Sequence, residues 1–94
     1  MNTTYAYGTI QRVWQVVWGD DVAQARRSAS NQHRVHCPYH ADSHPSCDVN
    51  LQKNTFCCRS CDAQGGLLDV VVLAGNAANR AAAVEWLRQH GIAL

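Results

Sequence analysis

The chain has 94 residues and a formal net charge of +1 at pH 7, which allows one small domain and gives little overall attraction to polyanions. No apolar run approaches the length that crosses a bilayer, so no membrane partner is expected. Five cysteines, an odd number without a signal peptide, argue against a complete disulfide framework and for a reducing cytoplasm. We expect residues 1–94 to form a single domain, with residues 1–8 loosely held.

The first element predicted along the chain is an amphipathic helix. Its apolar residues fall at i, i+3, i+4, i+7 and i+8, which places them on one helical face: Ile10, Val13, Trp14, Val17 and Trp18. Gly19 is expected to end this helix. We interpret both tryptophans as core packing residues.

Two hairpins are predicted in the middle of the chain. Residues 22–29 and 32–36 flank a turn at Ser30-Asn31. Residues 46–50 and 54–58 flank a second turn over residues 51–53.

Two helices are predicted after Gly65-Gly66, which are expected to interrupt regular secondary structure. A short apolar helix is expected over residues 67–74, stopping near Gly75. Asn79 is suited to cap a final helix over residues 80–90, with Gly91 as its stop. The buried face of that helix is expected to hold Ala83, Val84 and Leu87, with Trp86 at its edge.

Two short pairs of metal-binding side chains lie among these elements. Two residues separate Cys37 from His40 and Cys58 from Cys61, and seventeen residues separate the pairs. A gap of two residues lets one tight turn aim both side chains at a single ion. Three thiolates and one imidazole form the closed tetrahedral shell of structural zinc, and such soft ligands disfavour magnesium and calcium. The spacing therefore predicts one structural Zn²⁺.

Other assignments of these residues explain less. Cys58 and Cys61 alone are typical of a redox dithiol, but that interpretation leaves the matching upstream pair unexplained. Cys57 and His44 are alternative ligands that break the two-residue spacing. Because neighbouring strand residues point to opposite faces, Cys57 is expected to turn away from the metal. We interpret Cys57 and Cys47 as small buried hydrophobes.

Together these features predict an α+β fold, a small zinc-ribbon-like antiparallel sheet flanked by helices. A domain of this length buries a limited share of its surface, so a metal is a natural second source of stability. Zinc binding is therefore expected to be coupled to folding.

The chain contains the motifs Cys37-Pro38-Tyr39-His40, His44-Pro45-Ser46 and Val49-Asn50. They are followed by Phe56, Cys58, Cys61, Gly65 and an apolar helix from Leu67. Together these residues resemble the N-terminal zinc-binding domain of bacterial-type DNA primases. The resemblance runs from about Arg27 to the end of the chain. The sequence departs from the family pattern at Cys47, Arg59-Ser60 and Asp62, none of which is a ligand.

The resemblance implies a module of a primase, or of a primase accessory subunit, that binds single-stranded template DNA and helps to select primer initiation sites in DNA replication. A primase polymerase domain or a replicative helicase would be its partner. Whether the chain is part of an enzyme stays open. Alone it offers no plausible catalytic constellation, because its seven acids are scattered and the predicted metal shell is closed.

Cations hold the backbone of single-stranded nucleic acid, and aromatic rings stack on its bases. The stretch from Val22 to Ala41 contains no acidic residue. Three thiolates with Zn²⁺ subtract one charge, so the folded protein is expected to be close to neutral. The candidates for phosphate contact are Arg27, Arg34, Lys53 and Arg59, and those for base contact are His33, Tyr39 and Phe56. Core packing is an alternative for Phe56, which shares strand parity with Cys58.

A second hypothesis is a zinc-stabilised protein adaptor that docks a replicative polymerase or helicase without touching DNA. An exposed apolar patch that included Trp18 or Trp86 would favour this function.

Overall fold

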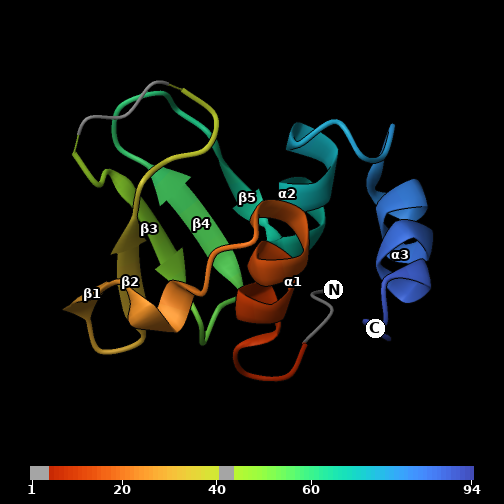
Figure 1. Cartoon of the computed structure of the whole chain (residues 1–94), viewed down its shortest axis with the longest axis horizontal. Helices are drawn as coiled ribbons and strands as arrows, with labels where there is room; N and C mark the ends of the chain where they lie inside the picture. The colour runs from red at the N-terminus through yellow and green to blue at the C-terminus, as the bar shows by residue number, and fades with distance from the viewer. Residues whose placement is uncertain (1–4, 41–43) are drawn as a thin grey trace.

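The computed structural model describes residues 5–40 and 44–94, which form a five-stranded antiparallel sheet with three α-helices and one 3-10 helix. Each strand pairs with the next along the chain, in the order β1-β2-β3-β4-β5 (Figure 1). The elements are α1 (Thr9–Trp18), η1 (Val22–Gln24), β1 (Arg26–Ala29), β2 (Gln32–Val35), β3 (Cys47–Asn50), β4 (Thr55–Cys58), β5 (Gln64–Gly66), α2 (Leu67–Leu73) and α3 (Arg80–Gln89). The predicted α+β fold class is confirmed.

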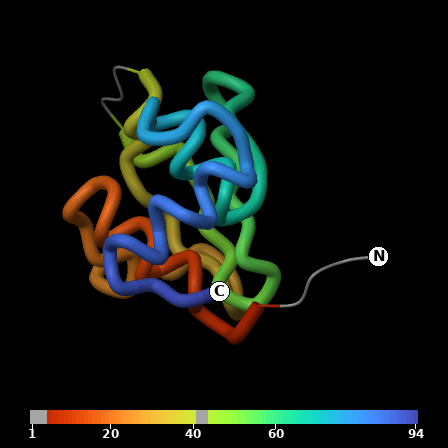
Figure 2. The backbone as a smooth tube through the Cα atoms, turned by 90° about the vertical axis from the view of Figure 1, so that its right-hand side faces the viewer, coloured from red at the N-terminus to blue at the C-terminus, as the bar shows by residue number. Residues whose placement is uncertain are grey.

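One face of the sheet carries the hydrophobic core. Cys47 and Val49 of β3 are buried, and so are Phe56 and Cys58 of β4, as strand alternation requires. Helix α1 packs on this face, and its Trp14 meets Phe56 edge to face with 5.7 Å between ring centroids. Helix α2 contacts both α1 and β5, and α3 packs against α2 at the side of the molecule (Figures 1 and 2).

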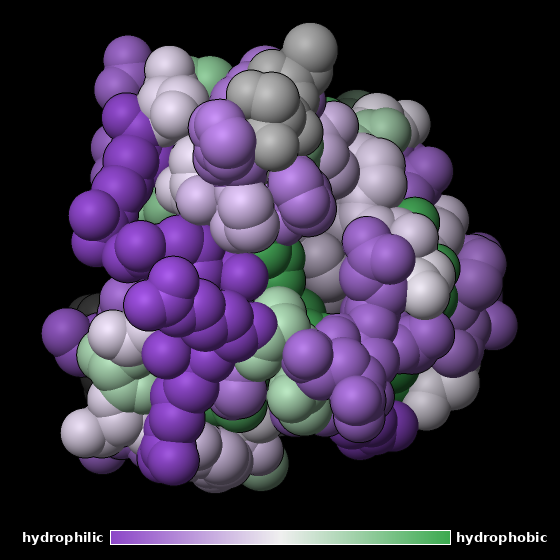
Figure 3. Space-filling model, turned by 60° about the vertical axis from the view of Figure 1, so that its left-hand side comes forward, coloured by the Kyte–Doolittle hydropathy of each residue, from purple (hydrophilic) through white to green (hydrophobic). Residues whose placement is uncertain are grey.

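The opposite face of the sheet is polar. Its middle row consists of residues paired directly across the five strands: Arg26, Arg34, Asp48, Cys57 and Gln64. We call this surface the open face, because the helices in the described part of the chain pack on the other side. Figure 3 brings the β1 side of the molecule forward and shows that hydrophilic side chains predominate there. This polar surface is the part of the sheet that remains available to a partner.

The predicted helices are confirmed. Gly19 follows α1 in the left-handed conformation, with φ 76°. The Asn79 side chain accepts a hydrogen bond from the backbone nitrogen of Ala82 and so caps α3. Trp14 is fully buried, whereas Trp18 is half-buried against the core. Both tryptophans therefore pack as expected.

Two local expectations need correction. Residues 22–24 form η1 and not a strand, because the Asp21 side chain accepts from the Ala23 nitrogen and caps a turn. Gly65-Gly66 do not interrupt the secondary structure but belong to β5, which pairs with β4. Of the residues expected to be loosely held, 1–4 lie outside the described part. The backbone nitrogen of Gly8, however, donates to Leu51 at 2.8 Å, which ties the start of α1 to the β3–β4 turn.

Candidate metal centre

The four predicted ligands meet at one end of the sheet. Both β2 and β4 run antiparallel to β3, so the carboxyl ends of β2 and β4 lie at the same end of the sheet. The Cys37–His40 turn follows β2, while Cys58 is the last residue of β4 and Cys61 lies in the turn beyond it. The sheet therefore brings together two pairs that are far apart in the sequence.

The donor atoms of these four residues have the spacing of a tetrahedral zinc site. The Sγ atoms of Cys37, Cys58 and Cys61 and a ring nitrogen of His40 all lie within 4.8 Å of one another. Cys37 Sγ is 3.6 Å from Cys61 Sγ, and His40 Nε2 is 3.3 Å from Cys58 Sγ. Tetrahedral ligands with metal–sulfur bonds of about 2.3 Å lie roughly 3.8 Å apart. The donor set and its spacing therefore fit one Zn²⁺.

Hydrogen bonds around Cys58 favour its thiolate form. Burial alone would raise the pKa of Cys58, but contacts from Ser46 Oγ at 3.4 Å, from the Ser60 backbone nitrogen at 3.4 Å and from His40 lower it to about 6. At Cys37 burial prevails and raises the pKa to about 12, even though the Tyr39 backbone N–H favours the thiolate. A bound cation deprotonates a coordinating thiol, so metal binding by Cys37 releases a proton.

Tyr39 anchors the first turn to the core. Its ring lies 5.4 Å from Trp18 and 5.8 Å from Phe56, measured between centroids. Its hydroxyl donates to the backbone oxygen of Val70 at 3.2 Å. The metal-binding turn is thereby packed against α1, β4 and α2, which limits the movement of two ligands.

The other candidate ligands lie outside this cluster. His44 and Cys57 are exposed, and neither belongs to the group of four donors. Cys47 is fully buried, as expected for a small hydrophobe, and burial raises the pKa of its thiol. The expectation that Cys57 is also buried is wrong. Its position in β4 turns it to the open face, away from both the core and the metal donors.

Comparison with known proteins places this centre in a family. The profile of the CHC2 zinc finger, the zinc ribbon of DnaG-type DNA primases, matches residues 9–94. The chain belongs to the CHC2 zinc finger family. The resemblance seen in the sequence is therefore confirmed, and the four clustered donors are the metal-binding residues of this zinc finger.

Two relatives illustrate the match. The DNA primase of Buchnera aphidicola subsp. Baizongia pistaciae is 28% identical over 46 residues, which cover 49% of this chain and 8% of that protein. The crystal structure of the Aquifex aeolicus primase (zinc-binding and RNA polymerase domains) has a TM-score of 0.58 and 24% identity, covering 96% of this chain and 23% of that one. The second likeness is one of fold. This CHC2 zinc finger spans only a small part of each relative.

The candidates for nucleic-acid contact do not form one surface. Arg34 lies on the open face, and Arg59, in the turn after β4, reaches that face to bond Asp48. Strand alternation places Arg27 and His33 on the opposite face, in register with Val49. Arg27 Nη2 donates to the Ser30 backbone oxygen, and His33 Nδ1 lies 2.9 Å from the Ala25 oxygen.

The remaining candidates are also separated. Lys53 is exposed in the turn between β3 and β4, at the end of the sheet away from the metal donors. Phe56 is 2% exposed and lies within the core, so no face of its ring is available to a base, and its alternative role in packing is the observed one. Tyr39 is half-buried and held by its ring and hydroxyl contacts.

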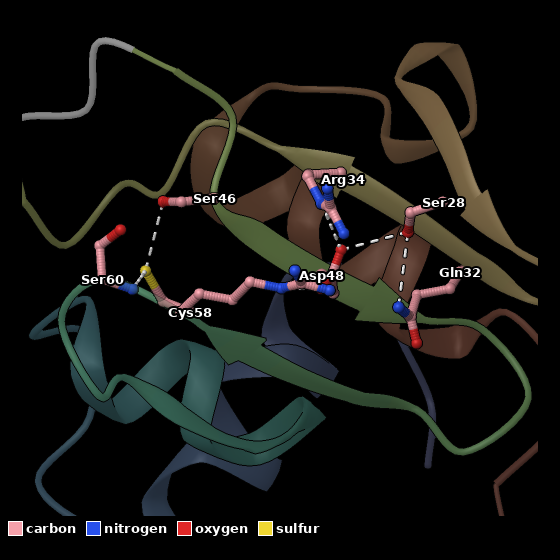
Figure 4. Close-up of polar contacts among 8 residues, drawn as sticks. Ser28, Gln32, Arg34, Ser46, Asp48, Cys58 and Ser60 are labelled. Atoms are coloured by element: carbon pink, nitrogen blue, oxygen red, sulfur yellow. Dashed lines mark hydrogen bonds and ion pairs between the residues drawn. The ribbon is translucent and has the colours of Figure 1, made fainter.

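Two polar residues of this region were not predicted. Asp48 pairs with Arg34 and Arg59 on the open face, and Ser46 approaches both His40 and Cys58. Figure 4 shows Asp48 beside Arg34, and Ser46 beside Cys58. The alternation of side chains along β3 could have predicted that Asp48 lies on the opposite face of the sheet from the buried Cys47 and Val49. Its partners, however, come from two other segments, and only the sheet register brings them together.

Neither tryptophan named for a docking surface is exposed. Trp18 packs on Tyr39, and Trp86 stacks on His90 with 3.8 Å between ring centroids. The exposed large apolar residues of the described part lie on separate segments: Tyr7, Val16, Leu73 and Leu94. None of the described helices combines the length and hydropathy needed to traverse a bilayer.

Proposed function

We propose that residues 1–94 form a single zinc-stabilised domain that binds single-stranded template DNA and helps to select primer initiation sites for a DNA primase in the cytoplasm. The observation that carries this proposal is the placement of two arginines, Arg34 and Arg59, on an open polar sheet face beside the metal centre of a primase-type zinc finger. The polymerase domain or helicase of the same system would act as its partner and carry out the chemistry or deliver the template.

The open face is suited to a sugar–phosphate backbone. Arg26 is exposed at one end of its middle row and Gln64 at the other, and none of the described residues in that row is aromatic. Guanidinium groups recognise phosphate, while base stacking requires exposed rings. We therefore expect the contacts that this face makes with the strand to be mainly electrostatic.

The zinc ion would act as a structural element in this function. When bound, it cross-links the carboxyl ends of β2 and β4 through four protein ligands and leaves no position for a catalytic water. Arg59 directly follows the ligand Cys58 and precedes the ligand Cys61 by two positions. Loss of the ion should therefore disturb the cationic surface as well as the fold.

Binding by this domain alone is expected to be weak. The net charge of +1 falls to about zero when three thiolates bind Zn²⁺, so attraction to DNA depends on a few local cations. A tether to a polymerase domain would raise the effective concentration of template and compensate for weak contacts.

The test is fluorescence anisotropy of labelled single-stranded oligonucleotides with the zinc-loaded chain at low and moderate salt, with circular dichroism to monitor the fold. Zinc-dependent binding that weakens with salt is the expected outcome. No binding by a folded, zinc-loaded chain would reject the proposal and favour the protein adaptor, for which a primase polymerase domain or a helicase would be the first partner to assay.

A further inference from the structure

We propose that Arg34 and Arg59, both held by the carboxylate of Asp48, form a two-arginine site for one phosphate group of a nucleic-acid strand, with Asp48 as its positioning residue. We call these three residues the arginine clamp. The choice of a nucleic-acid phosphate as ligand rests on the proposed function, whereas the geometry of the clamp does not.

Asp48 bonds both arginines and is less exposed than either of them. Arg34 Nε donates to its Oδ1 atom at 2.9 Å (Figure 4). Arg59 Nε donates to its Oδ2 atom at 3.2 Å. The Asp48 side chain is 11% exposed, whereas those of Arg34 and Arg59 are 29% and 64% exposed. The carboxylate therefore lies beneath the guanidinium groups, and the cations form the outer layer.

The free edges of both guanidinium groups are suited to a second anion. Both hydrogen bonds to Asp48 use Nε, and none of the contacts described for Arg34 or Arg59 uses an Nη atom. A guanidinium group has five N–H donors in one plane, so a bond through Nε uses one of them and leaves the N–H groups on the Nη atoms for another acceptor. Phosphate oxygens accept such paired donors well.

The carboxylate itself is held in place by β1. Ser28 Oγ donates to Asp48 Oδ1 at 3.1 Å, and Gln32 Nε2 donates to Ser28 Oγ at 3.4 Å. The β1–β2 register shifts between Arg27 and Ala29, so Ser28 lies at an irregularity of the ladder. Bulges of this kind redirect a side chain. Here Ser28 reaches across β2 to a residue of β3.

The clamp is connected to the metal centre through Arg59. The Arg59 backbone nitrogen donates to the Ser46 oxygen at 3.0 Å, and Ser46 also contacts the metal donors His40 and Cys58. Arg34 lies in β2, before the first ligand. Zinc release should therefore displace Arg59 more than Arg34 and open the clamp from one side.

The decisive experiment compares variants with opposite charge effects. Arg34→Ala and Arg59→Ala should each weaken binding of a short oligothymidylate about tenfold at low salt and reduce the salt dependence by about one phosphate contact. Asp48→Asn removes a negative charge, so simple electrostatics would strengthen binding. If Asp48 positions the arginines, this variant should instead weaken binding. A gain in affinity would overturn its positioning role.

The matched control is Arg12→Ala, which removes the same charge from the exposed surface of α1. It should leave affinity nearly unchanged. Zinc content and thermal unfolding of each variant would separate a lost contact from a lost fold. If the wild type binds the oligonucleotide but Arg34→Ala and Arg59→Ala behave like the control, the clamp is rejected and the proposed function stands.

A second readout does not depend on DNA binding. In ¹H–¹⁵N spectra of the zinc-loaded chain, the Nε–H signals of Arg34 and Arg59 should shift on titration with inorganic pyrophosphate, and that of Arg12 should not. Such shifts would support a phosphate site at the clamp even if the oligonucleotide fails to bind, a result that would reject the proposed function and the nucleic-acid strand as the ligand. Absence of shifts at both arginines overturns the clamp. Equal or larger shifts with an acidic peptide would overturn its assignment to phosphate.

Discussion

The Asn54 side chain joins the β3–β4 turn to the start of α1, where its Oδ1 atom accepts a hydrogen bond from the Ile10 backbone nitrogen at 2.9 Å. Its Nδ2 atom donates to the Ala6 oxygen at 3.0 Å. Gly8, at the N-cap position, has no side chain to satisfy the free N–H groups of the first helical turn. A buried amide 44 residues away therefore takes over that role.

Two substitutions of Asn54 should separate its hydrogen bonds from its backbone conformation, which is left-handed at φ 55°. Asn54→Gly loses the bonds only, whereas Asn54→Ala also places a methyl group in an unfavourable conformation. We expect Asn54→Ala to lower the free energy of unfolding by about 2–4 kcal/mol, and Asn54→Gly by about 1 kcal/mol less. Urea unfolding in excess zinc measures both. Asn76→Ala, at an exposed position, is the control, and equal effects of all three would contradict this role.

Neighbouring cysteines of β4 offer a matched test of the metal centre. Cys58→Ser should lose tight zinc binding and several kcal/mol of stability, because metal binding is coupled to folding. Cys57→Ser, one position earlier but facing the open side, should retain one zinc per chain and lie within about 0.5 kcal/mol of the wild type. Metal analysis and chelator competition provide the measurement. Loss of zinc from Cys57→Ser would show that the ligand register is wrong.

The ion pairs of Asp48 have a defined pH dependence. Burial alone would raise the pKa of Asp48, but hydrogen bonds from Arg34 and Ser28 and the charge of Arg59 outweigh burial and hold the pKa below its usual range. The ion pairs of Asp48 therefore stabilise the folded state fully above the unfolded-state pKa of about 3.9. This contribution to the free energy of unfolding is lost only as pH falls through the lower folded-state pKa.

Asp48→Asn should accordingly cost about 1.5–3 kcal/mol in the free energy of unfolding at neutral pH, since it removes a charged acceptor from beneath two arginines. The difference between wild type and variant should stay constant between about pH 8 and pH 5. Chemical denaturation at constant zinc saturation gives the difference at each pH. A decline within that window would mean that another group carries the effect.

Asp62 follows the last metal ligand in the left-handed conformation, with φ 61°. Aspartate tolerates this conformation better than alanine does, and glycine tolerates it best. Asp62→Gly should therefore keep stability within about 1 kcal/mol of the wild type, while Asp62→Ala should lower it by about 1 kcal/mol. Thermal unfolding of the zinc-loaded variants provides the comparison. A more stable alanine variant would indicate that the turn does not depend on this backbone conformation.

The parts of the structure that follow from local spacing were predictable. Two residues between ligands specify the metal-binding turns, and a period of 3.6 residues identified the buried face of α1 with Ile10, Val13 and Trp14. These signals act over one or two turns of chain. They needed no knowledge of how the segments pair.

Features that depend on pairing were missed. The three residues of β5 include two glycines and carry no strand signal, yet β4 pairs with them through its free edge. Gly65 is required there because a β-carbon would collide with the Asp69 side chain, which also accepts a hydrogen bond from the Gly66 nitrogen. Likewise, Asp48 acquires its partners only when three segments assemble in register.

The orientation of Cys57 makes it a chemical handle. Of the five cysteines, it alone is exposed, and it pairs directly across the ladder from Asp48. A maleimide dye or a nitroxide coupled to this thiol would sit beside the two arginines and report directly on what arrives there. The same exposure has a cost in the laboratory. Oxidation would join two copies through a disulfide at this sulfur, with their sheets face to face. In a preparation kept without reductant, the open face would therefore be covered by the second copy.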